Sequence, residues 1–318
     1  MGTTLWSDRH YEKRAAALRA KGKTAFAYDD DIRAQRVAAG VNPMMDPAKL
    51  TNGIRESRDS DAHPNSNAVS VLFDVTGSMR QVPRIMQENL CTLFNLLVQR
   101  EFLEDPAVLV GGSGDATCDL SALQVGQFES GNEIEDDLGR LFLEGGGGGQ
   151  LTESYELAFY FLARKTALDC LEKRGRKGYA FLIGDELPYG KVKRREVEHV
   201  FGDKLKSDIP LRRIIAEAQK KFEIYFVIPN LTCHYNNPEV LDCWRDLLGQ
   251  NVLRLNDPAG ISELVASTIG LAEDAVRWDD LSKDLRKAGA SRKVAGAVSS
   301  ALKGVSRNDL RGTGLTKF

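Results

Sequence analysis

The chain has 318 residues, of which 42% are hydrophobic and 28% charged, and its formal net charge is −2. These values are ordinary for a globular protein that is long enough to bury a core without disulfides or structural metals. A near-neutral chain has no overall attraction for nucleic acid, so a nucleic-acid partner would need a local basic patch.

Five cysteines, an odd number, are widely spaced and include no Cys-x-x-Cys pair. This pattern favours free thiols in a reducing compartment over a disulfide framework or a zinc site. The amino terminus lacks the apolar run of a signal peptide, and no stretch approaches the ~20 apolar residues that a membrane span needs. We therefore expect a cytoplasmic protein without a membrane segment.

Residues 1–66 differ in character from the rest of the chain. Residues 11–36 are rich in Ala, Arg and Lys and are expected to be helical in parts, whereas residues 55–64 are highly charged and end in proline. We interpret residues 1–66 as a charged N-terminal extension that lies over a domain.

Residues 67–276 alternate short apolar runs with longer segments of helical spacing. Such alternation predicts an α/β fold, Rossmann-like and doubly wound, with a mostly parallel central sheet and helices on both faces. We expect the third strand to be antiparallel, at an edge. The expected strands cover residues 69–73, 107–111, 123–128, 179–183, 223–228 and 252–255, and the expected helices cover residues 82–102, 134–144, 153–173, 210–221, 238–248 and a last segment that ends near residue 276.

Residues 277–318 are basic, with ten Lys or Arg and four Asp. We interpret them as a C-terminal tail, partly helical and partly disordered. A docking arm for an acidic partner or nucleic acid is the alternative, although no aromatic residues alternate with the charges to stack on bases.

The most informative segment is Phe73-Asp-Val-Thr-Gly-Ser-Met79, directly after the first buried strand. In a doubly wound sheet, ligands bind beyond the carboxyl ends of the strands. Asp74, Thr76 and Ser78 would bring one carboxylate and two hydroxyls together in a short loop, and a small hard cation prefers such oxygen ligands. The same residues could instead only cap the next helix.

This segment resembles the metal-ion-dependent adhesion site of von Willebrand factor A (vWA) domains, of an intracellular bacterial or phage type. The resemblance covers roughly residues 67–276 and implies a vWA domain that binds Mg²⁺ or Mn²⁺. In that family an Asp at the end of a later strand contributes to the site, directly or through water. Asp185, in Phe181-Leu-Ile-Gly-Asp185, has that position here.

The family also contributes a Thr that follows a glycine-rich loop. Here Gly145–Gly149 is followed by Thr152 and Glu153, and the sequence leaves open which of the two completes the site. A neutral Thr would leave positive charge on the metal to attract a carboxylate from a partner. Glu153 would neutralise part of that charge, and we hypothesise that it weakens recruitment of an acidic partner or holds the metal in a resting state.

Asp115 and Asp119 follow the second strand. If that strand neighbours the first, Asp115 could reach the rim of the same site. The alternative, which we favour, is that Asp115 forms an Asx turn or caps a helix.

No convincing catalytic constellation is present, and we expect that the chain is not an enzyme. A magnesium-dependent phosphoryl hydrolase of the haloacid dehalogenase type needs a second carboxylate two residues after Asp74, where this chain has Thr76. The glycines at 145–149 lack the following Gly-Lys-Ser/Thr of a phosphate-binding loop.

The expected function is therefore protein–protein recognition in the cytoplasm, dependent on Mg²⁺ or Mn²⁺. The resemblance implies a protein partner whose Asp or Glu could supply the last metal ligand, and makes an AAA+ ATPase or a multi-protein complex plausible. One alternative is a structural or assembly component in which the metal is a permanent structural ion. The other is a Mg²⁺-dependent phosphoryl hydrolase. Nucleic acid is expected only through the basic tail.

Overall fold

The computed structural model describes residues 5–146, 149–303 and 305 of the chain. A six-stranded sheet of order β12-β11-β7-β2-β3-β4 lies at its centre. The pairs are parallel except for β4, which runs antiparallel to β3 at one edge. The mixed α/β class, the mostly parallel sheet and the antiparallel third strand are as expected. The strands are β2 (Asn67–Asp74), β3 (Pro106–Ser113), β4 (Leu123–Val125), β7 (Gly178–Ile183), β11 (Phe222–Pro229) and β12 (Val252–Leu255).

Both faces of this sheet are covered, because its central strands are apolar on both sides. Every residue of β2, β3 and β7 is buried. Odd-numbered β2 residues such as Val71 belong to one hydrophobic core, and Leu72 belongs to the other. Near-continuous apolar strands of this kind are typical of parallel sheets buried on both faces.

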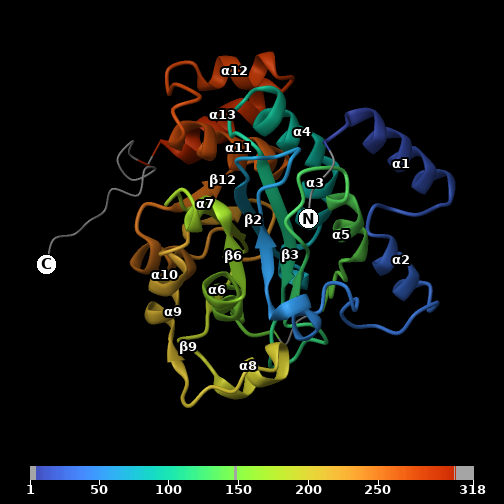
Figure 1. Cartoon of the computed structure of the whole chain (residues 1–318), viewed down its shortest axis with the longest axis vertical. Coiled ribbons are helices and arrows are strands. Elements are labelled where there is room, and N and C mark those ends of the chain that lie inside the picture. The colour runs from blue at the N-terminus through green and yellow to red at the C-terminus, as the bar shows by residue number, and fades with distance from the viewer. Residues whose placement is uncertain (1–4, 147–148, 304, 306–318) are drawn as a thin grey trace, which may run out of the picture.

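The helices divide between these two cores (Figure 1). One core is completed by α3 (Val82–Glu88), α4 (Leu90–Phe94), α5 (Ile134–Arg140), α11 (Ile261–Ala272), α12 (Leu281–Lys287) and α13 (Arg292–Leu302). The other is completed by α6 (Tyr155–Arg164), α7 (Asp169–Glu172), α8 (Arg194–Phe201), α9 (Leu211–Ala218) and α10 (Pro238–Leu248).

Three further strand pairs lie outside the central sheet. The first pair is parallel and joins the N-terminal extension to the segment after α6. The second, β5 with β8, is also parallel and lies beside the loops at the carboxyl end of the sheet. Their bounds are β1 (Arg55–Ser57) with β6 (Thr166–Leu168), β5 (Thr152–Glu153) with β8 (Leu187–Pro188), and the antiparallel pair β9 (Lys191–Val192) with β10 (Ile209–Pro210).

Residues near the N-terminus pack against the helices and loops that cover the sheet. Helices α1 (Asp8–Ala20) and α2 (Ala27–Arg33) form the outer edge of this part of the chain, drawn in blue in Figure 1. Trp6 stacks on the buried Phe94 with ring centroids 4.3 Å apart. The carboxylate of Asp29, fully buried, accepts a hydrogen bond from the backbone N–H of Leu143 at 3.3 Å. The extension is thus fixed to the segment that precedes the glycine-rich loop.

The first part of the expected C-terminal tail is packed into the domain. Helices α12 and α13 contribute Leu285, Val298 and Leu302 to the core beside α11. Spacing of three and four residues between small and aliphatic side chains produces this buried face. Residues 304 and 306–318, where the proposed docking arm would continue, lie outside the described residues.

Several helix bounds differ from the expected ones. The helix expected at 82–102 is divided into α3, α4 and a π-helical turn at Asn95–Gln99. The helix expected at 153–173 begins only at Tyr155, because the preceding residues pair as a strand, and a short strand also interrupts it. Helix α8 was not expected from the sequence; its buried face consists of Val197, Val200 and Phe201.

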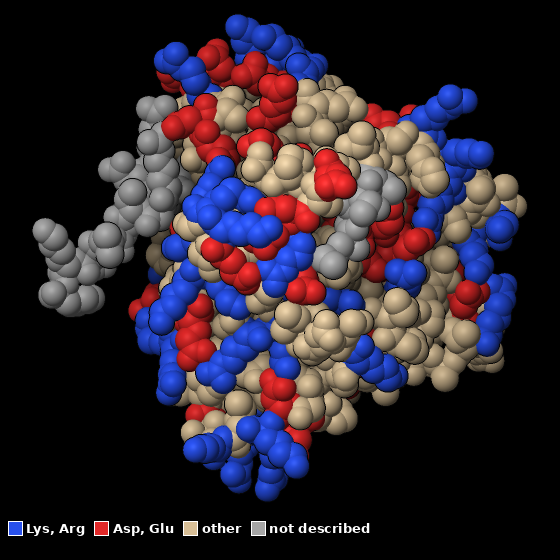
Figure 2. Space-filling model, in the orientation of Figure 1, with Lys and Arg blue, Asp and Glu red and all other residues tan. Residues whose placement is uncertain are grey.

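Lys and Arg side chains are interspersed with Asp and Glu over the face shown in Figure 2, with uncharged residues between them. Many of these charges are paired. Asp59, for example, accepts hydrogen bonds from both Nη atoms of Arg174, at 2.9 and 3.0 Å. Among the described residues, no helix is both long and apolar enough to cross a membrane.

Candidate metal centre

The loop after β2 brings together the three residues of the sequence motif. Asp74, the last residue of β2, is fully buried. Its Oδ1 accepts hydrogen bonds from the backbone N–H of Thr76 at 2.8 Å and from the Thr76 hydroxyl at 2.6 Å. The Ser78 hydroxyl lies 3.3 Å from Thr76 Oγ1. One carboxylate and two hydroxyls therefore converge at the carboxyl end of the sheet.

Asp185 joins this group from the loop after β7, the strand beside β2. Its Oδ1 accepts a hydrogen bond from the Ser78 hydroxyl at 2.7 Å, and its Oδ2 accepts one from the backbone N–H of His234 at 2.7 Å. Both carboxylate oxygens thus have protein donors. Asp185 is positioned to orient Ser78 and to tie the loop after β11 to the same centre.

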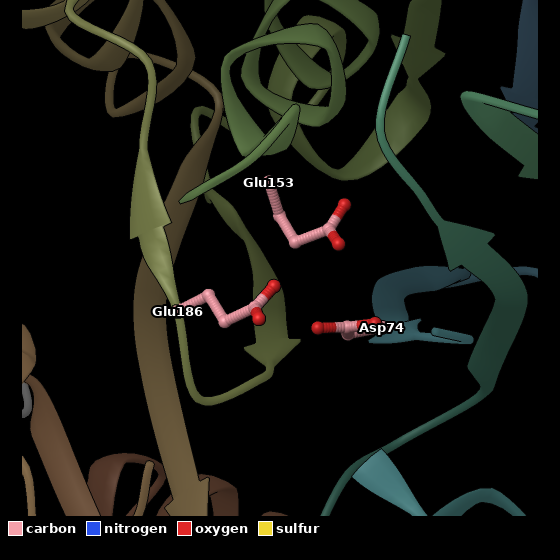
Figure 3. A group of neighbouring side chains, drawn as sticks. All are labelled: Asp74, Glu153 and Glu186. Carbon is pink, nitrogen blue, oxygen red and sulfur yellow. The ribbon is translucent and has the colours of Figure 1, made fainter. Parts of the chain in front are cut away.

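The structure distinguishes between Thr152 and Glu153. These residues form β5, where neighbouring side chains point to opposite sides. Glu153 is 3% exposed and its carboxylate faces Asp74 (Figure 3). Thr152 is partly exposed and does not line the cavity beside Asp74. The position after the glycine-rich loop is therefore occupied by a carboxylate.

Glu186 is a further member of the cluster that the sequence analysis did not identify. One carboxylate oxygen from each of Asp74, Glu153 and Glu186 lies within 4.8 Å of the other two, and the three side chains converge in Figure 3. Glu186 directly follows Asp185 in the sequence, so the acidic pair was visible. The turn between β7 and β8 decides that both side chains lie at this centre.

Two buried carboxylate oxygens of this cluster, Oε2 of Glu153 and Oε2 of Glu186, receive no hydrogen bond from an N–H or hydroxyl group of the protein. The two carboxyl groups interact with each other, through a proton held by Glu153. A buried polar atom without a partner costs free energy. A divalent cation with oxygen ligands would satisfy both atoms, so the residues present fit Mg²⁺ or Mn²⁺.

Burial also alters the protonation of these acids. Desolvation, followed by the proximity of Asp74, raises the pKa of Glu153 to about 12 and that of Glu186 to about 8. The pKa of Asp74 rises to about 7, because burial outweighs its hydrogen bonds from Thr76. Without a cation, protons neutralise part of the cluster, and a bound cation would replace them.

Two aromatic side chains, those of Tyr155 and Trp244, hold these loops in place. The hydroxyl of Tyr155, the first residue of α6, donates a hydrogen bond to Asp74 Oδ2 at 3.0 Å. Its ring packs edge-on against Trp244 with centroids 5.4 Å apart. The Trp244 indole N–H donates to the backbone carbonyl of Glu186 at 2.9 Å. The same aromatic pair thus fixes the end of β2 and the turn after β7.

The glycine-rich loop contacts the metal-binding loop directly. The backbone N–H of Gly77 donates to the carbonyl of Gly146 at 2.7 Å, and Gly145 N–H donates to the carbonyl of Val75 at 3.2 Å. A Cβ on Gly77 would lie 2.9 Å from that Gly146 oxygen. Glycine at position 77 is therefore required by close backbone approach.

Asp115 and Asp119 have local structural roles beside this centre. Asp115 Oδ1 accepts from the backbone N–H of Thr117 at 2.7 Å, which is an Asx turn, and its Oδ2 accepts from the Tyr189 hydroxyl at 2.9 Å. Asp119 accepts from the backbone N–H of Asp115 at 2.7 Å. The Asx-turn interpretation of Asp115 is confirmed.

The centre opens to solvent through a cavity of about 310 Å³. His234 lies at its mouth, with Nε2 3.6 Å from Glu186 Oε1. Among the described residues, none that lines the cavity is Lys or Arg. The lining residues are Thr76, Gly77, Ser78, Gly146, Gly149, Gln150, Glu153, Glu186, Cys233 and His234.

No family model matches the chain, and no curated protein matches its sequence. Solved structures with a similar arrangement include the open conformation of the pilus adhesin SpaC from Lactobacillus rhamnosus GG. That match has 10% sequence identity and a TM-score of 0.45, and covers 68% of this chain and 31% of the adhesin.

A second similar structure is proximal thread matrix protein 1 from the mussel byssus. It also has 10% identity, with a TM-score of 0.41, and the match covers 64% of this chain and 47% of that protein. The chain thus spans about a third of the adhesin and about half of the matrix protein.

Proposed function

We propose that the chain is a vWA-type, Rossmann-like protein that recognises a protein partner through a bound Mg²⁺ or Mn²⁺ ion. Asp74, Thr76, Ser78, Glu153 and Glu186 would hold the ion, and Asp185 would orient Ser78. The ion supplies a fixed positive charge and an open coordination position for a partner group. The observation that carries the proposal is the pair of buried carboxyl groups, on Glu153 and Glu186, that face Asp74 and whose Oε2 atoms receive no hydrogen bond from an N–H or hydroxyl group of the protein.

The position of the centre supports this proposal. It lies where β2 and β7, neighbouring parallel strands, end. Ligands of open α/β sheets bind beyond the carboxyl ends of the strands. All five cysteines are free, which favours a reducing compartment such as the cytoplasm.

Titration of Mg²⁺ and Mn²⁺ into the purified protein by calorimetry tests the proposal, with Asp74→Ala beside the wild type. We expect saturable binding to one site that is lost in Asp74→Ala. Asp119→Ala is the control, because it removes a nearby carboxylate that does not line the cavity and whose Oδ2 accepts a hydrogen bond from the backbone N–H of Asp115. Equal binding by wild type and Asp74→Ala, or no binding by the wild type, would contradict the proposal.

The second candidate is a permanent structural ion, as in an assembly component. The burial of the ligands favours it, since Asp74, Glu153 and Glu186 are at most 5% exposed. Chelator treatment distinguishes the two. A structural ion would exchange slowly and its removal would lower the melting temperature greatly, whereas a recognition ion would exchange quickly and change mainly partner binding.

A further inference from the structure

The proposed metal centre contains more negative charge than one divalent cation neutralises. Asp74, Glu153 and Glu186 face one another within 4.8 Å. Asp185 adds a fourth carboxylate through its hydrogen bond to Ser78. With all four ionised, one divalent cation leaves a net charge of −2 at the centre.

The neighbouring groups do not offset this excess. Asp115 lies close by, since its Oδ2 accepts a hydrogen bond from Gln150, which lines the cavity. His234 is the one titratable base among the described residues that line the cavity. The occupied centre therefore presents negative potential at a mouth that is open to solvent.

We propose that the partner group recognised at this centre is a cation, the Lys or Arg side chain of a protein, and not the carboxylate that a less acidic metal site would recruit. This inference rests on the proposed function, because it concerns the same ion and cavity. A partner carboxylate would meet four carboxylates and one cation, and like charges brought together at an interface are strongly unfavourable. A guanidinium or ammonium group would instead neutralise part of the remaining negative charge.

The cavity also offers acceptors for such a group, because Glu153 and Glu186 both line it. Where the ion binds the buried Oε2 atom of each carboxylate, the Oε1 atom remains as an acceptor. Arg in particular donates in pairs to carboxylates.

Selection from a random dodecapeptide library on the immobilised, Mg²⁺-loaded full chain tests the inference, with counter-selection on Asp74→Ala. We expect Lys or Arg to be enriched at one fixed position of the selected peptides. Replacing that residue by Asp should weaken binding by about tenfold or more. Enrichment of Asp or Glu, or no peptide surviving counter-selection, would overturn the inference.

Charge-relieving variants provide an independent measurement. Glu186→Gln and Glu153→Gln each remove one negative charge and keep the side-chain shape. A variant that retains Mg²⁺ binding by calorimetry should bind the selected peptide several-fold more weakly. Its affinities for the peptides with Arg and with Asp at the enriched position should also differ less than those of the wild type. Unchanged discrimination in a metal-loaded variant would contradict the charge argument.

Metal stoichiometry separates this inference from the proposed function. Mn²⁺ titration of the wild type should give one ion per chain. Binding of two ions that both require Asp74 would mean that a second metal, and not a partner cation, neutralises the excess negative charge. That result would overturn this inference and leave the proposed function standing. No metal binding would contradict the proposed function itself, and the inference with it.

Discussion

The hydroxyl of Tyr155 donates a hydrogen bond to Asp74 across the top of the central sheet, with Oη and Oδ2 3.0 Å apart. Tyr155 begins α6, and Asp74 ends β2. A Cβ on Gly184, after β7, would lie 2.0 Å from the same hydroxyl. The absence of a side chain at residue 184 is therefore what allows the tyrosine to reach the metal centre.

Replacing this tyrosine tests its role in positioning Asp74. We expect Tyr155→Phe to weaken Mg²⁺ and Mn²⁺ binding by about tenfold, because groups that orient metal ligands have effects of that order. Calorimetry measures the change. Tyr160→Phe is the matched control, since it removes a hydroxyl of the same helix that bonds to Asp203. Equal metal affinity in the two variants would show that the Tyr155 bond does not orient Asp74.

Metal binding and stability should depend on pH in opposite directions. The folded-state pKa values of Asp74 and Glu186, about 7 and about 8, lie above the ordinary values of 3.8 and 4.5. A carboxyl with a raised pKa contributes stability that is present below the ordinary pKa and is lost as pH rises through the folded value. We therefore expect this contribution to the stability of the metal-free protein to decline from about pH 4 to about pH 8.

A bound cation requires the ionised carboxylates, so its affinity should increase over the same pH interval, with proton release on binding. Melting temperature measured against pH, with and without saturating Mg²⁺, checks both directions. The stabilisation by Mg²⁺ should be larger at pH 8 than at pH 6. A stabilisation that is constant with pH, with no difference in binding heat between buffers of different ionisation enthalpy, would contradict the assignment of these acids as ligands.

The contact between the glycine-rich loop and the metal-binding loop provides another test. A methyl group on Gly77 would meet backbone oxygens of both Gly145 and Gly146, at 3.1 and 2.9 Å. Backbone cannot move aside as a flexible side chain does, so Gly77→Ala should displace Ser78 and weaken metal binding by about tenfold. Gly190→Ala, in the turn between β8 and β9, is the control, because its added Cβ has nothing within 4 Å and it does not line the cavity; it should bind metal as the wild type does.

The C-terminal helices should be needed for stability. Leu302 of α13 is fully buried in the core that includes α11. Leu302→Ala is expected to lower the free energy of unfolding by about 2–5 kcal/mol, which is the range for aliphatic truncations in a core. Chemical denaturation measures this value, with the exposed neighbour Lys303→Ala as control. A loss below ~0.5 kcal/mol, as at surface positions, would indicate a detachable tail.

The sequence by itself determined the succession of strands and helices along the chain and the part of the site that directly follows the first strand. The short apolar run at residues 69–73 predicts a buried strand, and the alternation of such runs with helical segments favours a parallel sheet. Asp74, Thr76 and Ser78 are separated by single residues, so any turn after the first strand brings them together. Local spacing was sufficient for these conclusions.

Only the tertiary structure decided the charge of the centre. Whether Thr152 or Glu153 faces Asp74 depends on the pairing of β5 with β8, because a shift of one residue in a strand exchanges its two faces. Glu186 enters the cluster through the turn after β7. The packing of α12 and α13 likewise depends on contacts with residues distant in sequence. Each of these features follows from long-range pairing, for which the chain carries no local signal.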